Sequence, residues 1–178
     1  EKIPETATIV DDLPDGHAVK EYAIKRGLLG LYPLLHFEDK LYKQRLVVPF
    51  TYNNELVGWT GRHISPPDKQ TPKYLHKMQP GYVFNMDAQD WTRKFVIVTE
   101  GPFDAITVSG VSILGSEIND IQKELINNLN RQVIVVPDRD APGEKLINQA
   151  IEFGWSVAFP EWEIGVNDIA EAVQRYGR

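Results

Sequence analysis

Two short, continuous apolar runs stand out along the chain, and each run is followed by acidic residues. Residues 95–99 lead into Glu100, and residues 133–137 lead into Asp138 and Asp140. Both runs are rich in β-branched residues, which is typical of strands buried on both faces of a parallel sheet. In parallel sheets, binding and catalytic residues lie at the carboxyl ends of the strands. If the two strands are neighbours, the three carboxylates converge on one small volume.

The remainder of the C-terminal half alternates between strand and helix patterns. Pro102 is suited to the first turn of a helix, and Ser116 is suited to capping the next one. The alternation implies right-handed crossovers and a parallel sheet with helices on both faces. We expect strands over 95–99, 111–114, 133–137 and 155–159, and helices over about 102–109, 117–129, 143–153 and 167–176.

The N-terminal half has a different pattern. Residues 1–16 are rich in Pro and Asp and show little periodicity, so a loose lead-in is predicted. Apolar residues at helical spacing predict a helix from His17 to Leu29. Runs at 46–50 and 55–59 flank a turn with two asparagines, which predicts an antiparallel hairpin. The expected domains are the lead-in 1–16, a small α+β subdomain 17–94 and an α/β domain 95–178.

Composition limits the class of protein. The 178 residues suit one medium domain or one domain with a small appendage, and 42% hydrophobic residues support a true core. Cys is absent, which excludes disulfides and thiolate zinc sites. No run approaches the roughly 18 apolar residues of a membrane span, so no membrane partner is expected. The start and end suggest a fragment of a longer protein.

The charge is distributed unevenly. The net charge is −6, yet residues 40–94 carry nine basic against four acidic residues, interleaved with Tyr, Trp and His. A basic stretch of this kind favours binding of nucleic acid or nucleotides. The alternative is an ordinary solvated surface. Charge alone leaves both interpretations open.

The acidic motifs indicate a metal site. Glu100 and Asp104 flank a helix start, where acids are also common for stability alone. Asp138 and Asp140 alternate along a turn, so both carboxylates can face one ion, although a surface turn also uses Asp. Crowded carboxylates repel one another unless a cation lies among them, and oxygen-only ligands suit Mg²⁺.

These motifs resemble the Toprim domain of primases, topoisomerases and related nucleases. The resemblance rests on Glu-Gly-x-x-Asp-Ala at 100–105 and on Asp-x-Asp-x-x-Gly at 138–143. Upstream and terminal segments are similar to DnaG-type primases of bacteria and phages, with the terminal ones similar to phage primases in particular. Those segments are 22–28, 45–50, 57–62, 72–75, 83–86, 166–169 and 176–178.

The resemblance implies a Toprim-type parallel-sheet domain preceded by a basic subdomain that binds nucleotide and template. It implies that Glu100, Asp138 and Asp140 are catalytic and hold Mg²⁺, or alternatively Mn²⁺, with Asp104 close by. Contacts to nucleotide phosphates or template are carried over to Arg45, Arg62 and Lys73.

The implied reaction is the synthesis of short RNA primers on single-stranded DNA. The implied partners are that template, ribonucleoside triphosphates and a replicative helicase. The implied location is the cytoplasm of a bacterium or of a phage-infected host.

Two positions depart from the family pattern. Gln79 stands where a Lys is often found, with Lys77 two residues earlier, and Gly165 stands where an acid is often found. Asp168 either replaces that acid or caps the final helix. The alternatives to a primase are a Toprim nuclease and a catalytically degenerate module that binds DNA or a helicase.

Histidine and tryptophan give weaker signals. His17, His36, His63 and His76 share no metal-binding spacing, so each is expected on the surface or satisfied in the core. Trp59 could stack on a base, but its position in a strand favours packing.

Overall fold

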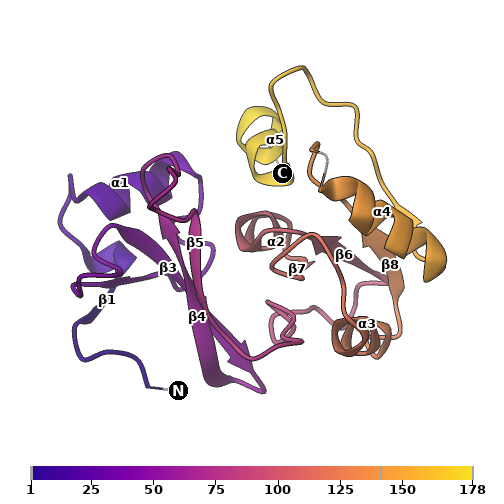
Figure 1. Ribbon diagram of the computed structural model, residues 1–178, viewed down its shortest axis with the longest axis horizontal. Helices are drawn as coiled ribbons and strands as arrows, with labels where there is room; N and C mark the ends of the chain where they lie inside the picture. Colours follow the sequence, from indigo (N-terminus) through magenta and orange to yellow (C-terminus); the bar gives the residue numbers. More distant parts are fainter. Residues whose placement is uncertain (1, 141, 178) are drawn as a thin grey trace. The chain divides into compact units, whose positions relative to one another are not determined.

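The computed structural model describes residues 2–140 and 142–177, which form two compact units (Figure 1). Unit 1 is Glu1–Gln79 and unit 2 is Pro80–Arg178. This division lies earlier than the boundary expected after residue 94. The reason is that Val83 belongs to the hydrophobic core of unit 2, and Phe84 forms a bridge with Ser112 there.

Unit 1 is built on an antiparallel sheet with the order β1-β2-β3-β4-β5. The predicted hairpin is confirmed by two long paired strands, which meet at Asn53 and Asn54. Both asparagines have positive φ, 51° and 62°, as a two-residue type I′ turn requires. The strands are β1 (Ala7–Ile9), β2 (Leu35–Phe37), β3 (Arg45–Tyr52), β4 (Glu55–His63) and β5 (Tyr74–Lys77).

The expected loose lead-in is instead part of the folded unit. β1 pairs with β2 in antiparallel register, and a short 3-10 helix, η1 (Val10–Asp12), follows it. Val10 and Leu13 are buried in this segment. The prediction of a loose lead-in was wrong because a three-residue strand is too short to show an alternating pattern of apolar residues.

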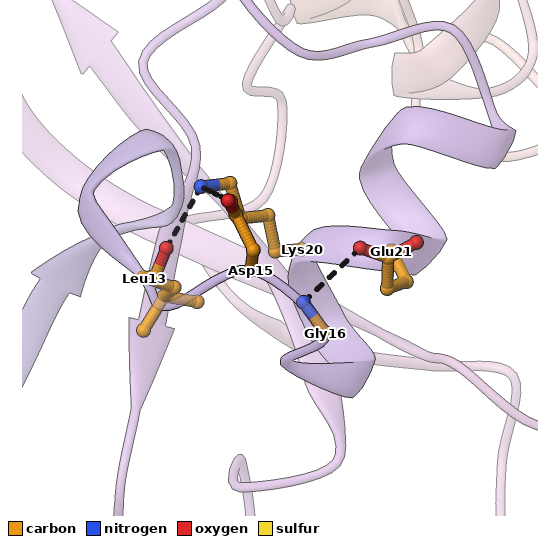
Figure 2. A network of polar contacts seen from close by, with 5 residues as sticks. All are labelled: Leu13, Asp15, Gly16, Lys20 and Glu21. Carbon is orange, nitrogen blue, oxygen red and sulfur yellow. Dashed lines mark hydrogen bonds and ion pairs between the residues drawn. The ribbon is translucent and has the colours of Figure 1, made fainter.

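Helix α1 (Ala18–Lys25) ends earlier than expected, and its first turn braces the loop before it (Figure 2). The Lys20 ammonium donates to the Leu13 carbonyl at 2.8 Å and to the Asp15 carboxylate at 3.0 Å. The backbone N–H of Gly16 donates to Glu21 at 3.3 Å. Residue 17 therefore enters the helix from a loop that is held in place.

Unit 2 contains the predicted parallel sheet, with the strand order β7-β6-β8-β9. The two apolar runs form neighbouring strands, since Val98 pairs with Val135 across them. The strands are β6 (Phe95–Thr99), β7 (Val111–Ser112), β8 (Gln132–Val135) and β9 (Ser156–Val157). The helices are α2 (Pro102–Val108), α3 (Asp120–Asn127), α4 (Gly143–Glu152) and α5 (Ile169–Tyr176).

Helices cover both faces of this sheet, which confirms the α/β fold class. Val96 and Val98 point into a core that contains Ile126 of α3 and Leu146 of α4. Ile97 points to the opposite face, where residues of α2 and α5 line a hollow of about 260 Å³ with it. Alternate residues of β6 thus pack against different helices, as expected for a strand buried on both sides.

One helix start was predicted wrongly. Ser116 does not cap α3. The N-cap of α3 is Asn119, whose side chain accepts a hydrogen bond from the Gln122 N–H at 2.9 Å. Gln122 in turn accepts from the Asn119 N–H at 3.1 Å, which completes a capping box.

Among the described residues, no helix has the length and apolar character needed to cross a membrane.

Candidate functional site

The two strand-end acids meet at the carboxyl edge of the parallel sheet. Glu100 directly follows β6, and Asp138 lies just beyond β8. The Glu100 Oε2 atom accepts a hydrogen bond of 2.7 Å from the backbone N–H of Asp138. Glu100 is buried, with 8% of its surface exposed. The sheet register therefore brings together Glu100 and Asp138, which are 38 residues apart in sequence.

Local backbone contacts fix both acidic segments. The Glu100 carbonyl accepts from the Ser112 hydroxyl at 2.8 Å and from the Gly115 N–H at 3.2 Å. At the other segment, a Cβ on Gly143 would lie 2.5 Å from the Asp138 carbonyl oxygen, so only glycine permits this close approach. Asp140 Oδ1 accepts from the Gly143 N–H at 3.0 Å, which ties the turn to the start of α4.

Arg139 points away from its two acidic neighbours, as an alternating turn implies. Its guanidinium donates to the carbonyls of Pro160 at 2.6 Å and Trp162 at 3.0 Å. It also lies over the Trp162 ring, 5.0 Å from the centroid. The positive charge of Arg139 is thus directed at residues 160–162.

Burial and neighbouring charges both perturb the two strand-end acids. Burial raises the pKa of Glu100 to about 7, and the charges of Asp138 and Asp140 add to this against the opposing hydrogen bond from Asp138. Burial also raises the pKa of Asp138 to about 7, helped by the charges of Asp168, Asp140 and Glu171. We call these five residues the acidic cluster. Such crowding is what a bound cation relieves.

The raised pKa values predict how stability depends on pH. A carboxyl whose pKa is higher in the folded than in the unfolded chain binds more protons when folded, so its ionisation costs stability as pH rises from about 4 to about 7. Asp138→Asn should therefore stabilise the chain at pH 8 and have little effect at pH 4. Allowing for the partial exposure of Asp138, the difference should be about 1–2 kcal/mol.

Denaturant unfolding in chelator at several pH values measures this difference. Glu152→Gln, which neutralises an exposed acid at the far end of α4, serves as the matched control. A stability difference for Asp138→Asn that does not grow with pH would contradict the raised pKa of Asp138.

Asp168 performs one of the two roles that the sequence left open, that of capping the final helix, and its replacement of the family's acid stays a prediction. Its Oδ1 atom caps α5 by accepting from the Glu171 N–H at 2.8 Å, and its charge also raises the pKa of Asp138. Gly165 has φ of +96°, where L side chains are rarely found, so an acid at that position would be strained. Glu171 was missed from the sequence, although an acid in the first helical turn after Asp168 was the available signal.

Asp104 connects two helices. It is buried, and its Oδ1 atom accepts from the Ala170 N–H at 2.8 Å, at the start of α5. Asp104 is not among the charges that raise the pKa of Glu100 or Asp138. Through this contact Asp104 positions α5, the helix that Asp168 caps and that contains Glu171. Its proximity to a metal ion stays a prediction.

The basic residues named from the sequence lie in unit 1, and Arg45 is buried there. Its guanidinium donates to the carbonyls of Leu41 at 3.2 Å, Gly61 at 3.0 Å and Pro72 at 3.1 Å. Burial lowers its pKa. Arg45 is 3% exposed, which leaves its charge serving the backbone of unit 1 rather than an external phosphate. The expected nucleotide contact is therefore not supported for this residue.

Arg62 and Lys73 are better placed for an external anion. Both lie near the Tyr74 ring, with the Arg62 Cζ at 5.2 Å and the Lys73 Nζ at 5.7 Å from its centroid. The Arg62 Nε also donates to the Tyr22 hydroxyl at 3.2 Å. Lys73 is exposed and Arg62 is half-buried. Two cations held beside one aromatic ring form a local positive surface.

Lys77 covers Trp59. The Lys77 Nζ lies 4.4 Å from the Trp59 ring centroid. Trp59 is 5% exposed and packs in a core with Phe37 and Val47. The packing interpretation of Trp59 is confirmed, and its ring face is not open to a base.

Comparisons with known proteins identify the class of fold. Superposition on a structure of the DnaG catalytic core gives a TM-score of 0.71 at 16% identity, covering 96% of this chain and 73% of that one. The primase fragment of the bacteriophage T7 primase-helicase protein gives a TM-score of 0.61 at 19% identity, covering 89% and 66%. The fold is that of primase catalytic cores.

Sequence comparison points to the same class. A curated DNA primase from Aquifex aeolicus is 23% identical over 164 residues, which is 83% of this chain. The chain spans 32% of the length of that relative. No family model matches the chain. The resemblance to DnaG-type primases is thus confirmed at the level of the fold.

Proposed function

We propose that this chain is the RNA-polymerase core of a DnaG-type DNA primase and joins ribonucleotides into short primers on single-stranded DNA. The observation that carries the proposal is the acidic cluster at the carboxyl edge of the sheet. Glu100 is bonded there to the backbone of Asp138, and both acids have a pKa raised to about 7. The likeness of the fold to primase cores supports the same conclusion.

The acidic cluster fits a hard divalent cation. Its donors are carboxylate oxygens only, and its mutual repulsion favours a positive charge at its centre. Glu100, Asp138 and Asp140 would hold Mg²⁺, or Mn²⁺ in its place. The ion would offset charge on the incoming triphosphate and on the departing pyrophosphate.

The remaining residues have supporting roles in this proposal. Asp168 and Glu171 add negative charge beside Asp138, and Asp104 anchors the helix that carries both. Arg62 and Lys73 would bind phosphate oxygens of nucleotide or template, because charge-assisted hydrogen bonds to phosphate are strong. Arg45 would act indirectly, since it holds the carbonyl of Pro72, next to Lys73.

The proposed partners are single-stranded DNA, ribonucleoside triphosphates and a replicative helicase. The proposed setting is the cytoplasm of a bacterium or of a phage-infected cell. These assignments rest on the likeness to primases and on the basic stretch at residues 40–94.

Primer synthesis with labelled ribonucleotides on single-stranded DNA, with Mg²⁺ or Mn²⁺, tests the proposal. Template-dependent RNA products are the expected result. Cleaved DNA would indicate a Toprim nuclease instead. The absence of both products, with retained DNA binding, would indicate a non-catalytic module. A pre-annealed primer should be included, because it separates failure to initiate from failure to extend.

The basic pair gives a second expected result. Arg62→Ala and Lys73→Ala should each weaken binding of single-stranded DNA and reduce its salt dependence. Removing a cation that neutralises one phosphate lowers the log–log slope by about 0.7, because fewer counterions are released. Fluorescence anisotropy over a range of salt concentrations measures this slope. Lys25→Ala, outside the basic stretch, is the matched control, and unchanged slopes in both test variants would reduce the pair to ordinary surface charge.

A further inference from the structure

Three side chains of unit 1 form a second group of potential metal ligands. His17, His36 and Glu38 each place one ligand atom within 4.8 Å of the others. We call them the histidine cluster. The sequence shows no metal-binding spacing among the histidines, so this group was not expected. His17 caps α1, whereas His36 lies in β2, so folding rather than spacing brings the two together.

The orientation of His36 is the most informative feature of this cluster. Its Nε2 atom lies 3.0 Å from the Lys43 carbonyl oxygen. Because a carbonyl only accepts, the Nε2 atom of the neutral ring carries the proton and the Nδ1 atom presents a lone pair. Histidines that bind metals are commonly oriented in this way, with the second ring nitrogen donating to a backbone carbonyl.

The lone pair of His36 has no hydrogen-bond partner among the described residues. The Nδ1 atom is buried and unpaired, in a residue that is 1% exposed. The nearest Glu38 oxygen is 3.7 Å away, which is too long for a hydrogen bond. The His17 ring packs edge-on at 4.8 Å between centroids. A buried, unsatisfied polar atom of this kind calls for an explanation.

We propose that His17, His36 and Glu38 bind one divalent transition-metal ion, with Zn²⁺ favoured by their chemistry. Two imidazoles and one carboxylate are a common zinc ligand set, whereas Mg²⁺ prefers oxygen alone. Ligand atoms of a tetrahedral zinc site lie about 3.3 Å apart, so the 3.7 Å between His36 and Glu38 needs little adjustment. The Glu38 side chain is 65% exposed, which leaves room for a water ligand.

Metal binding would replace one weak hydrogen bond of His17. Its Nδ1 atom now accepts from the Val19 N–H at 3.3 Å, at the long end of the hydrogen-bond range. Coordination through either nitrogen gives up this bond, since a neutral ring has only one lone pair. The preceding loop stays braced by Lys20 and Glu21 (Figure 2), so the position of His17 does not depend on the cap.

The consequence for unit 1 is a cross-link between two segments. The ion would join the start of α1 to β2. Because the ion binds only the folded arrangement, Zn²⁺ should raise the melting temperature of the chain. The role is structural, and it does not depend on the function proposed for the acidic cluster.

Isothermal titration of the full chain with Zn²⁺, in excess Mg²⁺ to saturate the acidic cluster, tests the proposal. We expect saturable binding of one Zn²⁺ per chain. His17→Asn should weaken it at least ~10-fold, because asparagine keeps an N-cap acceptor but removes a ligand. Glu38→Gln, at an exposed position, should also weaken it. His36→Ala is a poor choice because its ring is buried.

His63→Asn is the matched control. His63 also accepts from the backbone N–H two residues ahead, that of Ser65 at 3.1 Å, but lies outside the histidine cluster. The His63→Asn variant should bind Zn²⁺ as tightly as the unmodified chain does. Absorption of bound Co²⁺ gives a second readout, with tetrahedral nitrogen–oxygen ligation expected. No binding by the unmodified chain, or equal binding by His17→Asn and Glu38→Gln, would overturn the proposal.

Discussion

Replacing Asp138 and Asp140 together with asparagine should abolish primer synthesis while the chain stays folded. The substitution preserves side-chain shape but removes two of the charges that would hold the divalent cation. A metal ion supplies several kcal/mol of transition-state stabilisation, so a loss of at least ~10³-fold is expected. The measurement is the yield of labelled RNA on single-stranded DNA, with folding checked by circular dichroism.

Ion binding provides an independent check on the same variant. Mg²⁺ should raise the melting temperature of the unmodified chain, because it relieves repulsion around Glu100 and Asp138. The double variant should lose this stabilisation. Asp11→Asn with Asp12→Asn, which neutralises two exposed acids of η1, is the matched control and should retain it. An equal Mg²⁺ shift in the Asp138/Asp140 variant would contradict the site assignment.

Replacing Arg45 with methionine should destabilise unit 1 by at least about 3 kcal/mol. The change leaves the carbonyls of Leu41, Gly61 and Pro72 without their shared donor, and buried acceptors left unpaired are costly. Arg45→Lys should recover only part of the loss, because an ammonium cannot reproduce the planar fork of a guanidinium. Hydrogen exchange of the β3 and β4 amides measures the effect in this unit.

The Arg45 variant also separates structural from binding roles. Lys43→Met, at an exposed neighbouring position, is the control and should change stability little. At temperatures where the Arg45 variant is folded, its DNA-binding salt slope should match that of the unmodified chain. A large fall in slope with unchanged stability would show that Arg45 contacts phosphate after all.

Much of unit 2 was predictable because its signals are local. The runs that form β6 and β8 are apolar at nearly every position, and a strand buried on both faces requires that composition. Acids placed directly after them then fall at one edge of the sheet. The hairpin of β3 and β4 was predictable for a similar reason, since Asn53 and Asn54 accept the positive φ of its turn.

Short elements and element starts were less predictable. β2 has three residues and β5 has four, too few to establish a period, and their pairing depends on partners elsewhere in the sheet. The boundary between the units was displaced because Val83 is apolar like any core residue, and its pattern does not say which core it joins. For α3, Ser116 and Asn119 are both good caps, and only the capping box with Gln122 decided between them.

The sequence by itself determined the hairpin strands and the strands of the parallel sheet, and it placed Glu100, Asp138 and Asp140 after β6 and β8, because burial and turn preferences act over a few neighbouring residues. The tertiary structure alone decided which further side chains join them. Asp168 and Glu171 join the acidic cluster from α5, and His17 meets His36 from a different element. Likewise, the carbonyls that hold Arg45 come from separate segments. Such contacts depend on how distant elements pack together. The periodicity of apolar residues reports only the local helix or strand, so it does not reveal these contacts.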